Sequence, residues 1–462
     1  MTSGDIKLPP TSTSGSTVLV GLLSLMSCMW LLLDLPLFDL KRQAAANTDA
    51  ALFLVLFIGM PMVLWEVLWH KSYRNPSANL AVVCQSKNNW RVFTKWLGLV
   101  ATYSALAFVY WLLPLYRQDF YKPFMDAASG LLSTVLLVAW PYLSWVDKRQ
   151  ENPEQDVYFK IGQGLINFLL ALLKVGTYGQ VLTRLYKPSA PSAPSAPSAL
   201  TAPSVSSAAL NVPTWLAEFL RAWCVKLFFL PLMFGFICEN LAGISGWSFK
   251  WNQLSWVQQV EHLTVCIFMI DLLWGCVGYL WSLKICDSHI RSTEPTLLGW
   301  SVALAFYAPF NQVLGPSFFA YETNIKWHHW LAGYPEWAYV WGGALLLLHV
   351  CFVWATVVFG LRFSNLTHRG IITSGPYRYF KHPAYICKNL SWWMIAMPFM
   401  ATNSTSESLR LSLILILANI GYYLRAKTEE RHLLQTCPEY AVYTRALSAR
   451  SWGIRWKVPR SS

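Results

Sequence analysis

The sequence predicts an all-α protein, a polytopic bundle of transmembrane helices with about ten spans. Of its 462 residues, 55% are hydrophobic and only 13% are charged, which is too apolar for an ordinary soluble domain. Apolar runs near the length of about 20 residues needed to cross a bilayer recur along the chain. These runs cover residues 17–33, 51–69, 96–115, 128–146, 214–238, 257–283, 296–315, 337–360, 389–402 and 408–424.

The basic residues indicate how the bundle is oriented. The formal net charge is +13, but Lys and Arg lie in short loops beside apolar runs rather than on one soluble face, so we expect no nucleic-acid partner. By the positive-inside rule, the basic loops 71–95, 148–149, 284–291 and 362–388 lie on the cytosolic side with the tail. We therefore expect an integral membrane protein, surrounded by the bilayer, with both termini in the cytosol.

A low-complexity segment divides the chain. Pro, Ser and Ala dominate residues 188–213, which cannot form a core and should be an extended linker. We expect an N-terminal membrane module over 1–187, with about four spans and an interfacial helix over 158–185. A second membrane module covers 214–462.

No residue pattern predicts a metal site. The 10 cysteines are scattered and form no C-x-x-C pair. His328 and His329 are adjacent, but neighbouring side chains point in different directions and no further ligand has suitable spacing.

The last two apolar runs predict a helical hairpin. They are short, and the polar stretch 402–407 separates them, so the chain should enter the membrane and return to the same face. The segments on either side of the hairpin, 361–388 and 425–455, should therefore meet. They also contain the densest polar and aromatic sequence of the chain, and we place the candidate site there.

Both segments have features that would hold side chains in fixed positions. In the first, Gly and Pro residues break any helix, and Pro383 favours an extended conformation at His382. In the second, Arg425 and Glu429 lie four residues apart on one helical face, and Glu430 follows directly.

These segments resemble the isoprenylcysteine carboxyl methyltransferase family and its phospholipid methyltransferase relatives. The resemblance covers roughly residues 360–455 and includes G-P-Y-R-Y-x-K-H-P-A-Y, the hairpin, R-x-x-x-E-E and a closing Tyr440-x-x-Tyr443-x-Arg445. It implies a methyltransferase-type helical hairpin with a cytosolic cap and S-adenosylmethionine as cofactor. The residues that it implies for cofactor binding are Tyr377, Tyr379, His382, Pro383, Tyr385, Arg425, Glu429 and Glu430.

The chemistry of these residues agrees with that ligand. Carboxylates suit its ammonium and ribose hydroxyls, a basic group suits its carboxylate, and tyrosine rings suit stacking on adenine. Arg378 and Arg445 are the candidates for catalysis, because either could orient an anionic acceptor by a bidentate contact.

The resemblance leaves the acceptor open. A lipid or lipid-linked molecule is expected, with carboxyl O-methylation of an isoprenylcysteine-like group first and N-methylation of a phospholipid second. An NADPH-dependent membrane reductase of related fold is a third interpretation, against which the R-x-x-x-E-E pattern argues. A non-catalytic transporter or membrane scaffold is a fourth.

Other polar residues have simpler interpretations. Asp271, within the run 257–283, needs a partner or water at that depth, and it either pairs with a neighbouring helix or faces a polar cleft. Ser292 or Thr293 should cap the helix over 296–315. His349 should be buried and hydrogen-bonded, and Arg369 taken alone is a positive-inside anchor.

Overall fold

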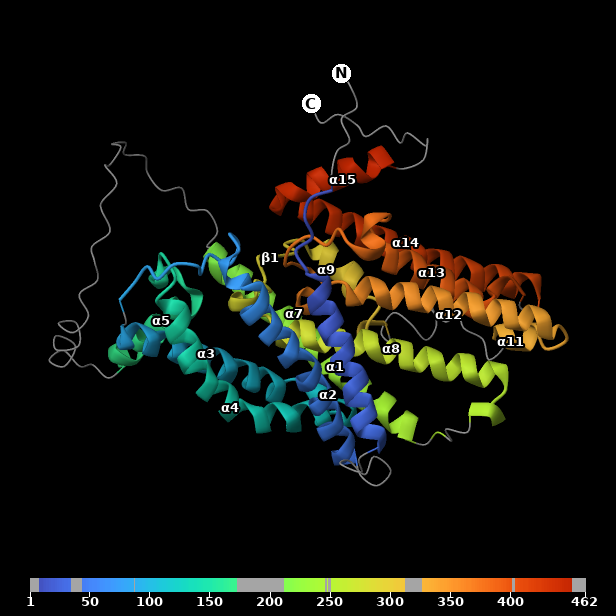
Figure 1. Ribbon diagram of the computed structural model, residues 1–462, viewed down its shortest axis with the longest axis horizontal. Helices are drawn as coiled ribbons and strands as arrows, with labels where there is room; N and C mark the ends of the chain where they lie inside the picture. The colour runs from blue at the N-terminus through green and yellow to red at the C-terminus, as the bar shows by residue number, and fades with distance from the viewer. Residues whose placement is uncertain are drawn as a thin grey trace, which may run out of the picture. The chain divides into compact units, whose positions relative to one another are not determined.

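The structure is a computed structural model and describes residues 8–34, 44–86, 88–172, 212–245, 247, 251–311, 326–400 and 404–450. Within them the chain is almost entirely helical, which confirms the predicted all-α class. The one sheet in these residues has two short strands, β1 (Ser292–Thr293) and β2 (Thr367–His368). The α-helices are α1 (Gly15–Asp34), α2 (Ala44–Trp65), α3 (Asn89–Leu112), α4 (Lys122–Asp147), α5 (Val157–Leu172), α7 (Thr214–Ser245), α8 (Trp256–Leu280), α9 (Leu297–Leu304), α11 (Trp327–Trp330), α12 (Pro335–Val357), α13 (Pro383–Ala396), α14 (Thr405–Thr436) and α15 (Pro438–Arg450) (Figure 1).

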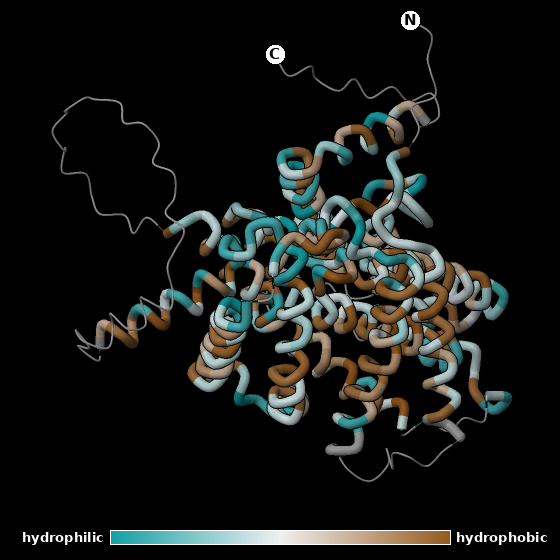
Figure 2. The backbone as a smooth tube through the Cα atoms, turned by 60° about the vertical axis from the view of Figure 1, so that its left-hand side comes forward, coloured by the Kyte–Doolittle hydropathy of each residue, from teal (hydrophilic) through white to brown (hydrophobic). Residues whose placement is uncertain are grey.

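Seven of the described segments are long and apolar enough to cross a membrane, as expected of an integral membrane protein. They are Asn47–His70, Asn89–Leu112, Asp119–Asp147, Thr214–Ser245, Trp256–Leu280, Pro335–Val357 and Thr405–Thr436. Many of the helices in Figure 2 are rich in hydrophobic residues, drawn in brown.

The predicted number of ten spans is not confirmed. The apolar part of α1 is short, α9 has 8 residues, and α13 has 14. At 1.5 Å per residue, α13 is about 21 Å long, which is less than the roughly 30 Å of the hydrocarbon core. It ends where Met397 adopts a left-handed conformation (φ 41°) just before Pro398.

The chain forms two compact units. Unit 1 comprises Met1–Ala81, Pro114–Leu131 and Arg221–Ser462, and unit 2 comprises Val82–Leu113 and Leu132–Leu220. In unit 2, Gly98 of α3 faces α5 so closely that a Cβ atom there would lie 1.9 Å from the Tyr158 carbonyl oxygen. Arg91 and Lys95 both pair with the fully buried Asp147, at 2.7 and 2.8 Å.

The proposed division into two membrane modules joined by a linker stays a prediction. Most of the Pro/Ser/Ala segment lies outside the described residues. Of the interfacial helix proposed over 158–185, the described part is α5, which ends at Leu172.

In unit 1 the predicted hairpin is present. Helices α12, α13 and α14 lie side by side (Figure 1). The Trp341 indole donates to the Met394 carbonyl at 2.9 Å, and the Trp393 indole donates to Asn419 Oδ1 at 3.0 Å. These bonds join α12 to α13 and α13 to α14, so the two arms of the hairpin are held against each other and against α12.

The two short strands join the loop between α12 and α13 to the segment before α9. Ser292 pairs with His368 and Thr293 with Thr367 in an antiparallel ladder. The prediction that Ser292 or Thr293 caps the following helix is therefore wrong. Thr296 is the cap instead, and its hydroxyl accepts a hydrogen bond from the Gly299 amide at 3.1 Å.

Candidate active site

The two segments that flank the hairpin meet, as the sequence predicts. Pro383 is the first residue of α13, where its missing N–H costs nothing, and His382 precedes it as the N-cap residue. His382 Nε2 lies 3.2 Å from Glu430 Oε1 on α14. The Tyr385 hydroxyl donates to Glu429, which also accepts from Arg425 Nε at 3.3 Å.

Arg425 is fixed from several sides. It is only 3% exposed. Its Nη2 donates to Asn365 Oδ1 at 2.7 Å, and its guanidinium lies 5.2 Å from the centre of the Tyr385 ring. The ion pair with Glu429 follows from the spacing of four residues on α14. A guanidinium held by a carboxylate, an amide and an aromatic face has one orientation rather than many.

A cavity of about 340 Å³ lies beside these groups. Five residues predicted to bind cofactor line it together: Tyr377, His382, Tyr385, Arg425 and Glu429. They come from the loop before α13, from α13 and from α14. Concave sites that combine apolar walls with a few convergent polar groups are typical of small-molecule binding.

The other predicted site residues are not among those that line this cavity. Glu430 pairs instead with His382 and with Lys427 Nζ at 3.1 Å. Pro383 is buried at the start of α13, and Tyr379 is 70% exposed. The two catalytic candidates, Arg378 and Arg445, are both exposed.

The closing tyrosines pack onto the loop that carries these residues. The Tyr443 hydroxyl on α15 donates to the Tyr377 carbonyl at 2.7 Å. Tyr440 and Tyr443 belong to a buried cluster with Ile371, and burial raises the pKa of both phenols. Helix α15 therefore covers the loop and fixes its backbone.

The comparisons with known proteins point to the same part of the chain. Residues 340–435 match the family model of isoprenylcysteine carboxyl methyltransferase (ICMT). The resemblance predicted from the sequence is thus confirmed for this region. The cobalt-zinc-cadmium resistance protein CzcN of Cupriavidus metallidurans is 30% identical over 125 residues, which are 26% of this chain and 55% of that protein. The chain thus spans about half the length of this curated relative. No solved structure matches.

The ICMT-matching region also contains a buried arginine that the sequence does not reveal. Arg369 is 2% exposed and lines the cavity, so it is not a surface anchor. Its guanidinium donates to the carbonyls of Ser288 (2.6 Å), Gly278 (2.8 Å), Phe363 (2.9 Å) and Leu361 (2.8 Å). Burial lowers its pKa to about 9. A basic residue in a loop indicates only membrane side, so nothing in the sequence separates this role from anchoring.

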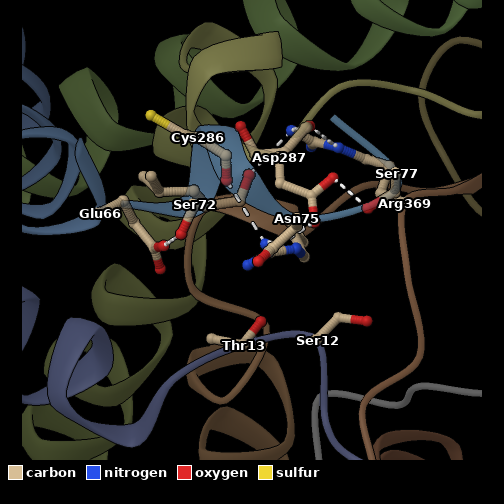
Figure 3. Close-up of polar contacts among 12 residues, drawn as sticks. Ser12, Thr13, Glu66, Ser72, Asn75, Ser77, Cys286, Asp287 and Arg369 are labelled. Atoms are coloured by element: carbon tan, nitrogen blue, oxygen red, sulfur yellow. Dashed lines mark hydrogen bonds and ion pairs between the residues drawn. The ribbon is translucent and has the colours of Figure 1, made fainter. Parts of the chain in front are cut away.

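A cluster of polar contacts lies outside the ICMT-matching region, around Asp287. Asp287 accepts hydrogen bonds from Ser77 at 2.7 Å and from Asn75 at 3.0 Å (Figure 3). It also accepts one from Arg291 at 3.1 Å. Burial alone would raise the pKa of Asp287, but these bonds and the positive charge of Arg362 outweigh it and lower the pKa. The loop after α2 is thereby joined to the segment before α9.

The N-terminal segment is attached to the site loop as well. The Ser12 amide donates to the Ile371 carbonyl at 2.7 Å, and the Ile371 amide donates to the Ser12 hydroxyl at 2.9 Å. The Thr13 hydroxyl donates to the Phe359 carbonyl at 3.0 Å. Figure 3 shows Ser12 and Thr13 side by side on this segment. Residues 8–13, in which the sequence shows no motif, are therefore attached to residues that line the cavity, Ile371 and Phe359.

The remaining polar residues behave as follows. Asp271 accepts a hydrogen bond from Thr356 of α12 at 2.5 Å and lines the cavity, so both alternatives considered for it apply. His349 is 2% exposed and lies 3.3 Å from the Thr264 hydroxyl, as predicted. Among the described residues, no group of three His, Cys, Asp or Glu side chains could hold a metal ion.

Proposed function

We propose that the protein is an integral membrane, S-adenosylmethionine-dependent methyltransferase that acts on a lipid or lipid-linked acceptor. The observation that supports this best is the meeting of the two segments flanking the hairpin. Groups 44 and 48 residues apart in the chain bond to each other at the cavity, in the Tyr385–Glu429 and His382–Glu430 contacts. Both lie within the ICMT-matching region.

The residues at the cavity fit the proposed cofactor. Glu429 offers a carboxylate for an ammonium group or for ribose hydroxyls, and Arg425 offers a guanidinium for a carboxylate. Tyr377 and Tyr385 offer aromatic faces for adenine. When bound, S-adenosylmethionine would supply a methyl group on a positively charged sulfur atom.

The chain's own residues would act mainly by positioning. Tyr385 and Arg425 both bond to Glu429, so the carboxylate is oriented before a ligand arrives. Met233, Phe236 and Phe268 give the cavity apolar walls that would exclude water from the reacting groups. Correct placement of two reactants can contribute about 7–11 kcal/mol to lowering a barrier. The resemblance favours a prenylcysteine carboxylate as acceptor, followed by a phospholipid amine.

Calorimetric binding of S-adenosylmethionine to the full-length protein in detergent tests this proposal. Wild type should bind saturably, and Glu429→Gln should weaken binding about tenfold or more, because a charge-assisted hydrogen bond contributes about 1.5–3 kcal/mol. His382→Ala should weaken it as well.

Glu407→Gln is the matched control. Glu407 lies on the same helix and also pairs with an arginine, Arg410, at 2.6 Å, but it is at the other end of α14. Its substitution should leave binding unchanged. Absence of binding by a folded wild-type protein would refute the proposal, and so would equal affinities for Glu429→Gln and Glu407→Gln.

A further inference from the structure

A second layer of polar residues lies next to the proposed cofactor residues. Lys388 follows Tyr385 by three positions on α13, and Tyr422 precedes Arg425 by three positions on α14. Residues three apart share one face of a helix. Lys388 and Tyr422 therefore lie one turn closer to the tip of the hairpin, and both line the cavity.

Aromatic rings surround the Lys388 ammonium. Its Nζ lies 5.3 Å from the ring centre of Trp392, 5.5 Å from that of Tyr422 and 6.0 Å from that of Phe352. Within the described part of the chain, no carboxylate oxygen lies within 4.0 Å of this ammonium group. A charged side chain in an apolar helix is costly, and such residues usually have a function.

An acidic side chain lines the same cavity. Asp271 of α8 is partly exposed there, as Lys388 is, and the two groups attract each other electrostatically. The bond from Thr356 engages one of its oxygens, Oδ1. Since the two charges are not in direct contact, a ligand group can lie between them.

The opposite charges of Lys388 and Asp271 determine which polar group of a ligand can bind between them. A carboxylate ligand would be attracted by Lys388 but repelled by Asp271, and an ammonium ligand would experience the reverse. A hydroxyl group can donate its proton to Asp271 and accept a hydrogen bond from Lys388. The apolar residues Met233, Phe268 and Leu272 line the cavity beside Asp271 and suit an apolar body.

We propose that Lys388 and Asp271 bind the weakly acidic hydroxyl group of an apolar, phenol-like acceptor. This inference rests on the proposed function and names its substrate class. A phenol has a pKa near 10, so a carboxylate acting as base together with a nearby ammonium can remove its proton, unlike that of an alkyl alcohol.

The phenolic O–H bond breaks and its proton passes to Asp271. The oxygen lone pair forms the new bond to the methyl carbon as the bond from that carbon to the sulfonium sulfur breaks. The electron pair of the broken bond stays on sulfur, which becomes a neutral thioether. Lys388 stabilises the negative charge that develops on the oxygen.

Binding without any methyl donor gives the first test. Dodecylphenol, dodecanoic acid and dodecylamine share one chain and differ in the polar group. The full-length protein in detergent should bind dodecylphenol most tightly, by titration calorimetry, and Lys388→Met should weaken that binding by about tenfold. Lys122→Met is the control, because Lys122 is 66% exposed at the start of α4.

Transfer of a labelled methyl group from S-adenosylmethionine gives the second test. Wild type should methylate dodecylphenol, and Asp271→Asn should lower the rate by about 10²-fold or more, as expected for loss of a general base. In Asp271→Asn, the rate should rise about tenfold with each unit of increasing pH, because the fraction of ionised phenol rises by that factor. A purely structural role of Asp271 would not produce this pH dependence.

The outcomes separate the two proposals. Methylation of the carboxylic acid or the amine, but not of the phenol, would overturn this inference and leave the methyltransferase proposal standing. No transfer to any of the three by protein that also fails to bind S-adenosylmethionine would overturn both. Equal phenol binding by wild type and Lys388→Met would also overturn the inference.

Discussion

At the scale of single residues, the loops around the cavity contain titratable groups that the fold keeps uncharged. His368 on β2 is 5% exposed and lines the cavity. Burial and, to a smaller extent, the charges of Arg291 and His432 lower its pKa to about 4 against the opposing effect of Glu439. The folded protein therefore binds this proton less tightly than the unfolded chain does.

This predicts that acid weakens the fold through His368. Between pH 6.5 and about 4, the unfolded chain takes up a proton at His368 that the folded protein does not, so the stability contribution is complete above pH 6.5 and falls as pH decreases. The slope of unfolding free energy against pH in this window reports how many more protons the unfolded chain binds than the folded protein. In His368→Asn that number should be smaller by about one. Thermal unfolding of both proteins across this window measures the slope, and identical slopes would contradict the prediction.

How much of the site the sequence reveals also differs from residue to residue. His382, Arg425 and Glu429 could be predicted because their spacing in short motifs fixes their relation on one loop and one helix. Arg369 and Lys388 could not be predicted, because a lone basic residue gives the same sequence signal whether it lies at the cytosolic surface of the membrane or is buried in the protein. Only contacts with residues distant in sequence, Ser288 for Arg369 and Tyr422 for Lys388, distinguish the two cases.

At the scale of elements, the N-terminal segment and the site loop depend on each other. Gly370 has a φ of +112°, which side chains disfavour, and a Cβ atom there would lie 2.5 Å from the Ser12 hydroxyl oxygen. Next to it, Ser12 and Ile371 exchange two hydrogen bonds. The Thr373 hydroxyl adds a bond to the Pro9 carbonyl at 2.9 Å.

Gly370→Ala should therefore loosen this attachment. The strained conformation costs about 1–3 kcal/mol, and the contact with Ser12 adds to it, so the midpoint of thermal unfolding should fall. Gly243→Ala on α7 is the control, since a Cβ atom there meets no other atom within 4 Å and Ala favours the helix. A midpoint for Gly370→Ala equal to that of Gly243→Ala would show that the segment does not need this glycine.

The elements also show which part of the fold the sequence does not determine. Apolar composition identified the run 389–402, but α13 starts at Pro383 and ends at Ala396 because a proline opens it and a left-handed Met397 closes it. In the run 296–315, α9 has only 8 residues and ends at Leu304. Hydropathy indicates where apolar segments lie, whereas backbone conformation sets how many are long enough to span.

At the scale of the whole molecule, both ends of the described chain reach one loop of unit 1. Ser12 bonds to Ile371, and Leu8 packs against the cluster that Ile371 forms with Tyr440 and Tyr443 of α15. Ile371 follows the C-terminal end of α12, the helix that crosses from Pro335 to Val357. We therefore expect the N-terminal and C-terminal segments to lie on the same side of the membrane as the cavity's polar residues.

The positive-inside rule predicts that this side faces the cytosol, so tags at both termini should be cytosolic. An epitope at either end should be detected only after the inner face is made accessible. An epitope inserted at Gly333, next to the start of α12 and so at the opposite end of a spanning helix, should be detected from outside. Tags on opposite sides would contradict the pairing of Ser12 with Ile371. Two external termini would keep that pairing but reverse the orientation, and would place the proposed cofactor residues on the side where S-adenosylmethionine is not made.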